Sequence, residues 1–163
     1  MVGSAGNDTL SGGDGFDTLD MSDVDADVAV NLQDGTANGS ETGADVISGF
    51  ENVVTGAGDD TVTGSSADDT ISTGDGADTI DGGDGIDLID GGAGNDVISD
   101  GAGSDLARAG AGDDTVIAGA GNDSLDGGDG TDTLNMSNAS SGAVVDLGAG
   151  TASSAETGND QVS

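Results

Sequence analysis

Aspartate recurs at every ninth residue of this chain, and it is the residue type best placed to do chemistry. From Thr55 to Asn135 nine contiguous nonapeptides read approximately Gly-Gly-x-Gly-x-Asp-x-(apolar)-x, and residues 82–90 are a clean copy. Carboxylates can act as acid and base in glycoside hydrolysis, or as oxygen ligands for a cation. The sixth-position aspartates are Asp8 and Asp17 in two earlier copies, then Asp60, Asp69, Asp78, Asp87, Asp96, Asp105, Asp114, Asp123 and Asp132.

The other residue types argue against catalysis. The chain contains no His, no Cys and no Lys, so it lacks the side chains of a catalytic triad, a zinc motif or a Schiff-base nucleophile. A single pair of carboxylates would suit glycoside hydrolysis. Acids at every ninth position are better explained as repeated ligands, and there is no Trp or Tyr to hold a sugar ring. We therefore expect a protein that is not an enzyme.

The charge of the chain restricts its partners. With 33 acidic residues, one basic residue and no His, the formal net charge is −32. Nucleic acids and anionic membrane surfaces attract Lys and Arg, so neither is an expected partner. No apolar stretch approaches the roughly 20 residues that span a bilayer, so we expect no membrane insertion by this segment. The composition alone would suit a disordered polyanion, but a disordered tail has no reason to repeat with a fixed period.

Each nonapeptide predicts a tight turn followed by a minimal strand. Glycines at the first, second and fourth positions allow positive φ, and after the Asp come three residues of which only the middle one is apolar. Stacked copies would place these apolar side chains between two parallel sheets. The predicted inward residues are Val62, Ile71, Ile80, Ile89, Ile98, Ala107, Val116, Leu125 and Leu134. The sequence therefore predicts an all-β solenoid with loops along both edges.

A solenoid of this kind has a thin core, so its acidic loops must be neutralised. If every strand crosses the roll, neighbouring aspartates on one edge are 18 residues apart in sequence. In space they are separated by about 4.8 Å, the distance between adjacent strands. Carboxylates at that spacing, beside turns rich in carbonyl oxygens and without nitrogen or sulfur ligands, indicate a hard-cation site. Several oxygen ligands per ion suit Ca²⁺ better than Mg²⁺, which needs a tighter octahedron and retains its water.

The nonapeptide resembles that of the RTX (repeat-in-toxin) proteins, a family of calcium-binding repeats. The resemblance implies a right-handed parallel β-roll with Ca²⁺ between successive turns on each edge, in a protein that bacteria export by type I secretion. It also implies that Asp78 shares ions with Asp60 and Asp96, and Asp87 with Asp69 and Asp105. Backbone carbonyls that would complete the shells belong to Gly56, Gly58, Gly74, Gly76, Gly83, Gly85, Gly92, Gly94, Gly101, Gly103, Gly110, Gly112, Gly119 and Gly121.

The pairing of aspartates also predicts how many ions bind. In residues 55–135 there are four same-edge pairs on one edge and three on the other, so we expect at least seven ions there. Two copies depart from the pattern. Residues 64–72 carry Ser and Ala at three turn positions, and residues 100–108 begin with Asp100 in place of Gly. We expect one or two ions near these coils to be weak or missing.

The segments that flank the array repeat one another. Residues 3–48 align with residues 118–163 at an offset of 115, so the chain holds one long period and the start of another. We expect one RTX β-roll module over residues 1–163, a piece of a larger array. Its expected parts are nonapeptides at 3–20, wider coils at 21–54, nonapeptides at 55–135, and the start of a second wider-coil segment, cut short, at 136–163.

Asp45 is a further candidate ligand outside the array. It sits in a nonapeptide-like frame in which Ile47 is the inward residue. A shortened half-turn over residues 49–54 would then place Asp45 over Asp60, at the start of the main column of aspartates.

The sequence thus predicts a calcium-binding structural module of a secreted bacterial protein, which folds on binding Ca²⁺ outside the cell. Adjoining domains of a larger chain are its expected partners, and the oligomeric state stays open. Two alternatives remain: a ligand- or ice-binding adhesin surface on the same roll, and the appended domain of an extracellular hydrolase. A row of threonines for ice binding is interrupted at Leu88, Val97 and Leu106 among the outward seventh positions.

Overall fold

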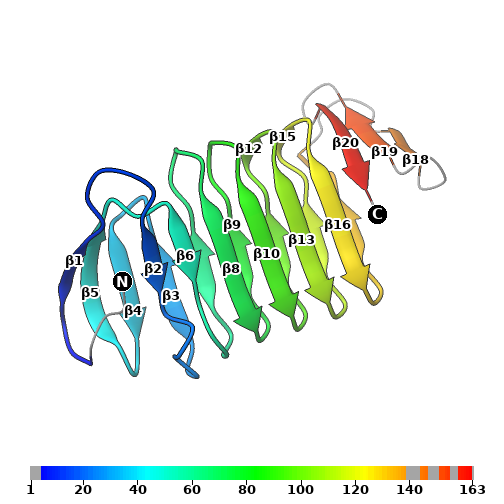
Figure 1. The fold of residues 1–163 in the computed structure, drawn as a ribbon. Helices are drawn as coiled ribbons and strands as arrows, with labels where there is room; N and C mark the ends of the chain where they lie inside the picture. Colours follow the sequence, from blue (N-terminus) through cyan, green and yellow to red (C-terminus); the bar gives the residue numbers. More distant parts are fainter. Residues whose placement is uncertain (1–4, 139–143, 147–150, 155–157, 163) are drawn as a thin grey trace.

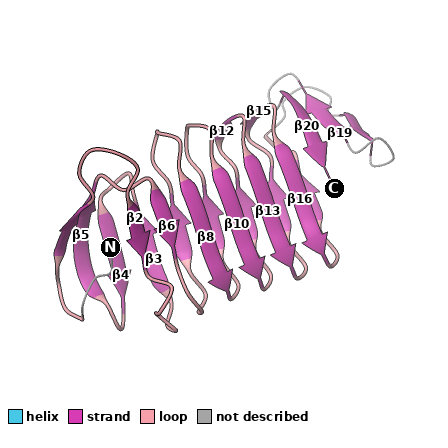
Figure 2. Ribbon diagram, viewed as in Figure 1, coloured by secondary structure: helices cyan, strands magenta, loops and turns pink. Residues whose placement is uncertain are grey.

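The computed structural model describes residues 5–138, 144–146, 151–154 and 158–162. The strands of this part of the chain stack side by side along a roll, with the chain advancing from one end to the other (Figure 1). Strands and loops account for all of the described residues, and no helix is present among them (Figure 2). The predicted all-β roll of parallel stacked coils is confirmed.

In the described residues the strands form two nine-stranded sheets and one short ribbon. Sheet A consists, in spatial order, of β1 (Thr9–Ser11), β5 (Gly43–Ser48), β4 (Thr36–Gly39), β3 (Val28–Asn31), β7 (Thr61–Thr63), β9 (Thr79–Asp81), β11 (Val97–Ser99), β14 (Thr115–Ile117) and β17 (Thr133–Asn135). Sheet B consists of β18 (Val144–Asp146), β19 (Thr151–Ser154), β20 (Gly158–Val162), β16 (Ser124–Asp129), β13 (Leu106–Ala111), β10 (Leu88–Ala93), β8 (Thr70–Asp75), β6 (Asn52–Val54) and β2 (Thr18–Asp20). The ribbon pairs β12 (Ala102–Gly103) with β15 (Ala120–Gly121).

Successive nonapeptides alternate between the two sheets. The chain leaves β8 in sheet B, turns through residues 76–78 into β9 in sheet A, and returns through residues 82–87 to β10. In sheet B, Ile71 pairs with Ile89 and Ile89 pairs with Ala107, so one coil takes 18 residues. This register fixes the faces of every strand, because a shift by one residue would turn the apolar side chains outward.

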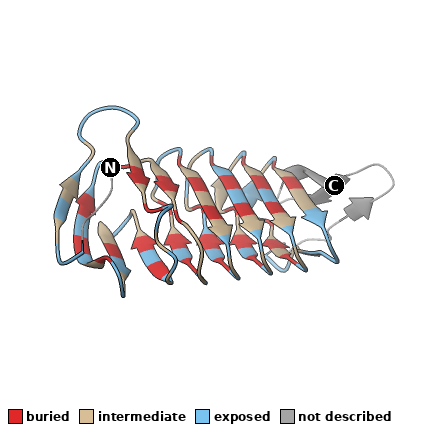
Figure 3. Ribbon diagram, turned by 60° about the horizontal axis from the view of Figure 1, so that its bottom comes forward, coloured by how far each residue is buried: buried red, intermediate tan, exposed pale blue. Residues whose placement is uncertain are grey.

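The core is an aliphatic ladder between the sheets, visible as buried stripes along the roll (Figure 3). The predicted inward residues Val62, Ile71, Ile80, Ile89, Ile98, Ala107, Val116 and Leu125 are each at most 3% exposed. Leu134, near the end of the array, is only partly buried. Complete burial of one such aliphatic side chain contributes about 1.5–3 kcal/mol. The core prediction is therefore confirmed except at its last residue.

Sheet B is wider than predicted, because four of its strands have six residues instead of three. β8 continues through the third position of the next nonapeptide and buries Thr73, at the first position, as well as Ile71. β13 does the same with Ala109 and Ala107. The turn that follows such a strand needs only three residues, such as 76–78, whereas the opposite turns keep six, such as 82–87. The two edges of the roll therefore differ in shape.

The turn glycines serve two different purposes. Gly83 and Gly85 have φ values of 98° and 131°, which side chains with a Cβ rarely adopt, as predicted. Gly82, at the first position, is outside the positive-φ region, so that part of the prediction is wrong. A Cβ on Gly82 would lie 2.5 Å from the carbonyl oxygen of Asp100 and 2.8 Å from Oδ2 of Asp87. Glycine is needed there for space.

Residues 21–54 do not form the wider coils that we expected. They contain an antiparallel meander, in which β3 pairs with β4 and β4 with β5. The outer strands of the meander join the roll in parallel, β5 against β1 and β3 against β7. In sheet B, β6 lies directly between β2 and β8. Sheet A therefore gains two strands, β3 and β4, that have no counterpart in sheet B.

The duplication read from the sequence is confirmed in the pairing of the strands. Val30 pairs with Ala37 in the first meander, and Val145 pairs with Ala152 in the second, each residue displaced by 115 positions. The pairing of β16 with β20 has the same register as the earlier pairing of β1 with β5. The first meander extends sheet A and the second extends sheet B. The connections at 139–143, 147–150 and 155–157 lie outside the described residues.

Candidate metal-binding edges

The sixth-position aspartates form two columns, one along each edge of the roll. Where the chain passes from sheet B to sheet A, the B-to-A edge, they are Asp60, Asp78, Asp96, Asp114 and Asp132. On the opposite A-to-B edge they are Asp69, Asp87, Asp105 and Asp123. The predicted alternation between edges, with neighbours 18 residues apart, is confirmed.

Hydrogen bonds fix the direction of each carboxylate in a column. The backbone N–H of Asp60 donates to Oδ1 of Asp78 at 2.8 Å, and the N–H of Asp78 donates to Oδ1 of Asp96 at 2.9 Å. Corresponding bonds continue to Asp114 and Asp132 on this edge and along the whole A-to-B column. One oxygen of each carboxylate is therefore used within the protein, and the other is left for a different partner.

The second oxygens are buried and accept no hydrogen bond from the protein. They are Oδ2 of Asp60, Asp78, Asp87, Asp96, Asp105 and Asp114, and Oδ1 of Asp69. These residues are at most 3% exposed. Burying a charged oxygen without a partner costs several kcal/mol, and native proteins rarely leave such atoms unsatisfied. Stacked rows of buried carboxylate oxygens therefore fit a bound cation.

The electrostatics of the columns lead to the same conclusion. Burial, with a smaller contribution from neighbouring aspartates, raises the pKa of Asp87 to about 7 and that of Asp96 to about 6. Hydrogen bonds from the backbone act in the opposite direction but do not compensate. Burial likewise raises the pKa of Asp60, Asp69, Asp78 and Asp105. Without a cation, the ionised columns are unfavourable at neutral pH.

The donor set is made only of oxygen, which suits a hard cation such as Ca²⁺. Several of the glycine carbonyls predicted as ligands also bind the next coil: the carbonyl of Gly83 accepts from the N–H of Ala102 at 2.7 Å, and that of Gly101 from Ala120 at 2.8 Å. A carbonyl oxygen has two lone pairs, so one remains for a cation. The coordination itself stays a prediction.

The nonapeptides match a known family model. The model of the RTX calcium-binding nonapeptide repeat, four copies long, matches residues 1–20, 45–80, 54–89, 72–105, 81–116 and 99–134. The chain belongs to this RTX family. No curated protein sequence matches the chain. Within the described residues no helix has the length and hydropathy of a membrane span.

The RTX match leaves out residues 21–44, and this segment corrects one of the predicted ligand positions. Asp45 does not lie over Asp60, because β3 and β4 separate the two residues within sheet A. The backbone N–H of Asp8 instead donates to Oδ1 of Asp45 at 2.8 Å, so Asp45 continues the column of Asp8. Asp45 is 3% exposed, whereas Asp8 is half-buried. The backbone N–H of Val28, and not that of an aspartate, donates to Oδ1 of Asp60. Asp60 is therefore the first aspartate in the B-to-A column of the RTX array.

Glu51 occupies a place in the A-to-B column that the sequence analysis missed. It precedes β6, which lies between β2 and β8, so Glu51 stands between Asp17 and Asp69. The backbone N–H of Asp17 donates to Oε2 of Glu51 at 3.1 Å. Oδ2 of Asp17 is buried and accepts no hydrogen bond. The sequence signal that could have identified Glu51 is an acid two residues before an inward apolar residue, as in every RTX nonapeptide, but with Glu in place of Asp.

A second ladder, on the outside of the turns, was also missed. The backbone N–H of Ala77 donates to Oδ1 of Asp59 at 2.9 Å, and that of Ile86 to Oδ1 of Asp68 at 2.8 Å. Asn95 and Asp113 accept corresponding bonds from the next coil. These residues take the fifth position, and their bonds run in the direction opposite to those of the sixth position. Asp or Asn at the fifth position therefore ties successive turns together.

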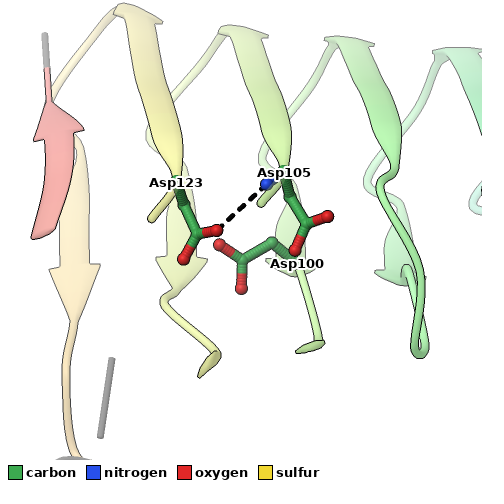
Figure 4. Close-up of side chains that lie close together, drawn as sticks. All are labelled: Asp100, Asp105 and Asp123. Atoms are coloured by element: carbon green, nitrogen blue, oxygen red, sulfur yellow. Dashed lines mark hydrogen bonds between the residues drawn. The ribbon is translucent and has the colours of Figure 1, made fainter. Parts of the chain in front are cut away.

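The two irregular RTX copies differ in their effect. In residues 64–72 the backbone N–H and the hydroxyl of Ser65 both donate to Oδ2 of Asp69, at 2.6 and 2.9 Å, and so compete with a cation for that oxygen. In residues 100–108, Asp100 is fully buried and its carboxylate meets those of Asp105 and Asp123 (Figure 4). The sequence analysis treated Asp100 as a defect in the repeat, whereas the structure directs its side chain into the edge.

Of the remaining predicted ligands, the two at the ends of the columns are more accessible. Asp132 is exposed, although its Oδ1 still accepts from the N–H of Asp114 at 3.1 Å. Asp17 is half-buried near the other end of the roll. The interior of the RTX array therefore offers the most enclosed positions for ions.

Proposed function

We propose that this chain is a structural module in which calcium ions bind between successive coils along both edges and thereby fold and stiffen the roll. The observation that carries the proposal is the pair of columns of buried aspartates, each with one oxygen that accepts no hydrogen bond. The membership in the RTX family of calcium-binding repeats supports calcium as the ion.

The energetics make calcium a requirement for folding. The chain carries a formal charge of −32, has no cysteine for a disulfide, and contains 33 glycines, each costly to order. Its core is a ladder of single aliphatic side chains. A metal site that does not exist in the unfolded chain contributes its binding free energy directly to folding. We assign no catalytic step to the roll.

We further propose how the ions are shared. Asp78 binds one ion with Asp60 and another with Asp96, and Asp87 does the same with Asp69 and Asp105. The columns of residues 55–135 then hold at least seven ions, and Glu51 extends the A-to-B column toward Asp17. Glycine carbonyls of the turns complete the shells.

The location of the protein follows from the affinity expected for such sites. Extracellular calcium modules bind with dissociation constants of about 10⁻⁴–10⁻³ M. In a calcium-poor cytosol the chain would stay unfolded, and it would fold outside the cell. We therefore propose a secreted or surface-exposed bacterial protein, exported by type I secretion, in which this module supports or spaces adjoining domains. An adjoining hydrolase domain is compatible with this role.

A calcium titration tests the proposal. We expect the chain in excess chelator to be expanded, by small-angle X-ray scattering, and to lack regular structure, by circular dichroism. Millimolar Ca²⁺ should convert it into a compact β protein, and the same concentration of Mg²⁺ should not. A compact β spectrum that persists in excess chelator at neutral pH would contradict the proposal.

A second candidate function, a surface that binds ordered water or ice, is favoured by one observation. The residues at the seventh positions lie alternately in sheet A and sheet B. On the outer face of sheet A they pair with one another in a continuous row of four threonines and one valine, whose side chain has a similar shape. The row is Thr61, Thr79, Val97, Thr115 and Thr133. The residues that break the row in sequence, Leu88 and Leu106, lie in sheet B. Thermal hysteresis of the calcium-loaded chain is the measurement, and its absence rejects this candidate.

A further inference from the structure

In the nonapeptides that begin with Gly64, Gly82, Gly91 and Gly127, the first position faces the sixth-position carboxylate of the same copy. A Cβ on Gly91 would lie 2.7 Å from Oδ2 of Asp96, and a Cβ on Gly82 would lie 2.8 Å from Oδ2 of Asp87. Where the first position is threonine, as in Thr73, its hydroxyl lies close enough to the sixth-position Asp78 to lower the pKa of that carboxyl, although it donates its hydrogen bond to the carbonyl oxygen of Gly91 at 2.8 Å. The side chain at the first position therefore points at the oxygen that is available to a cation.

Asp100 places a carboxylate at this first position. It is fully buried, and one oxygen each of Asp100, Asp105 and Asp123 lie within 4.8 Å of one another. Among the described residues this is the one group of three acidic side chains with that geometry. Figure 4 shows the three carboxylates converging from neighbouring coils on the A-to-B edge.

Hydrogen bonds hold this group in place. The N–H of Gly119 donates to Oδ1 of Asp100 at 2.6 Å, and the N–H of Asp105 donates to Oδ1 of Asp123 at 3.0 Å. Oδ1 of Asp105 accepts from Asp87, while its Oδ2 is buried and accepts no hydrogen bond. Asp105 is 3% exposed. An unpartnered, buried carboxylate oxygen therefore lies within the group.

The distances fit one Ca²⁺ ion. Calcium binds oxygen at 2.3–2.6 Å, so two ligands on opposite sides of the ion are about 4.6–5.2 Å apart, and ligands at smaller angles are closer. Three oxygens that are mutually within 4.8 Å can all bind the same ion. For the shorter bonds of Mg²⁺ the largest separation is about 4.2 Å.

We propose that Asp100, Asp105 and Asp123 form a three-carboxylate calcium site that binds more tightly than the two-carboxylate sites of the same array, and that fills first as calcium rises. The inference rests on the proposed function and adds a ranking of its sites. Calcium affinity rises with the number of charged ligands in a site, so an added carboxylate is expected to change the dissociation constant by roughly tenfold. The coil at residues 100–108, which has the smallest core residue, Ala107, is then held by its strongest ion.

Three variants of the full chain test the site. Asp100→Asn keeps the shape and removes the charge, and Asp100→Thr introduces the residue found at the first position in Thr73, which keeps a hydroxyl there but carries no charge. Asp84→Asn is the matched control, because it removes one exposed charge from a turn on the same edge. Competition with a chromophoric chelator measures the affinity for the first equivalents of Ca²⁺, and equilibrium dialysis counts the ions at saturation.

We expect both Asp100 variants to bind the first equivalent roughly tenfold more weakly than the unmodified chain. Asp84→Asn should bind it as the unmodified chain does, and both Asp100 variants should still fold at saturating calcium. First-equivalent affinities within twofold of each other for Asp100→Asn and Asp84→Asn would overturn the inference. Folding of the Asp100→Asn chain in excess chelator would also overturn the inference. It would mean that Asp100 and Asp105 of the unmodified chain share a proton and not a calcium ion. Failure of the unmodified chain to bind calcium at all would instead reject the proposed function.

Discussion

The backbone N–H of Asp69 donates a 2.9 Å hydrogen bond to Oδ1 of Asp87, which lies 18 residues later in the chain and one coil further along the roll. Asp87 donates from its own N–H to Asp105 in the same way, at 2.8 Å. Each aspartate therefore binds the preceding coil through its side chain and the following coil through its backbone. A change at one aspartate is felt by two interfaces between coils.

The first prediction compares a column aspartate with a turn aspartate. Asp87→Ala removes a buried carboxylate shared by two proposed ions, so it should raise the calcium midpoint of folding and reduce its cooperativity, because each coil depends on its neighbours. Asp84→Ala removes an exposed carboxylate from a third position, where Ala93 and Ala102 stand in other copies. Its effect should be small, or slightly stabilising through relief of repulsion. Circular dichroism during a calcium titration measures both midpoints.

Equal midpoints for these two variants would mean that the aspartates act only as a diffuse negative field. The model of specific sites between coils would then have to be abandoned.

The second prediction concerns pH in the absence of calcium. Because burial raises the pKa of Asp87 to about 7 and of Asp96 to about 6, the roll without metal is most stable below the unfolded pKa of about 4 and loses stability as pH rises toward 7. Acid should therefore partly replace calcium, so that the chelated chain gains β structure between pH 7.5 and about 5. Protons and calcium compete for the same oxygens, so the affinity of the folded roll for calcium should fall over this range.

The measurement is circular dichroism with light scattering, which separates folding from precipitation near the pI of about 4.1. Asp87→Asn removes one of the shifted groups and should weaken the pH dependence. A chelated chain that is equally unfolded at pH 5 and pH 7.5 would show that these carboxylates do not limit folding.

The third prediction tests the aliphatic ladder. Ile89 is completely buried between the sheets, so Ile89→Ala should cost about 2–5 kcal/mol of unfolding free energy at saturating calcium. Ile86 is 61% exposed in the adjoining turn, and Ile86→Ala should change stability by no more than about 0.5 kcal/mol. Urea denaturation in excess calcium gives both values. Similar losses for the two variants would place Ile89 outside the core.

The fourth prediction is the number of ions. The four same-edge pairs on one edge and three on the other in residues 55–135 should hold at least seven ions when calcium is saturating. Glu51, between Asp17 and Asp69, should add to this number. Native mass spectrometry or a crystal grown with ample calcium counts them directly. Fewer than five ions would reject the sharing of ions between successive aspartates.

The nonapeptide predicted the two sheets, the inward residues and both columns of aspartates, because a strict period forces every copy into the same local structure. The meander was not predicted, since Val28-Ala29-Val30 has the alternation of a roll strand and nothing local distinguishes parallel from antiparallel pairing. The strand that pairs with this segment, β4, consists only of the short stretch Thr36–Gly39. Long-range pairing decided the outcome.

Residues that depart from the consensus were the hardest to interpret. Asp100 reads as a missing glycine in the sequence, yet the first position faces a carboxylate of its own copy, a relation that only the folded coil reveals. Glu51 was overlooked because its copy has lost the glycines of the first and second positions, although Gly49, the acid and the inward Val53 remain. In both cases the position within the coil, and not the residue type alone, sets the role.

The unequal numbers of strands in the two sheets have a mechanical consequence. The two additional strands of the first meander lengthen sheet A by about 10 Å relative to sheet B. A strip that is longer on one face curves toward the other, so we expect the axis to bend toward sheet B at this point. The second meander, 115 residues later, lengthens sheet B, so the bend expected there has the opposite sense. The curvatures at the two meanders would then oppose each other, so the roll as a whole would stay close to straight.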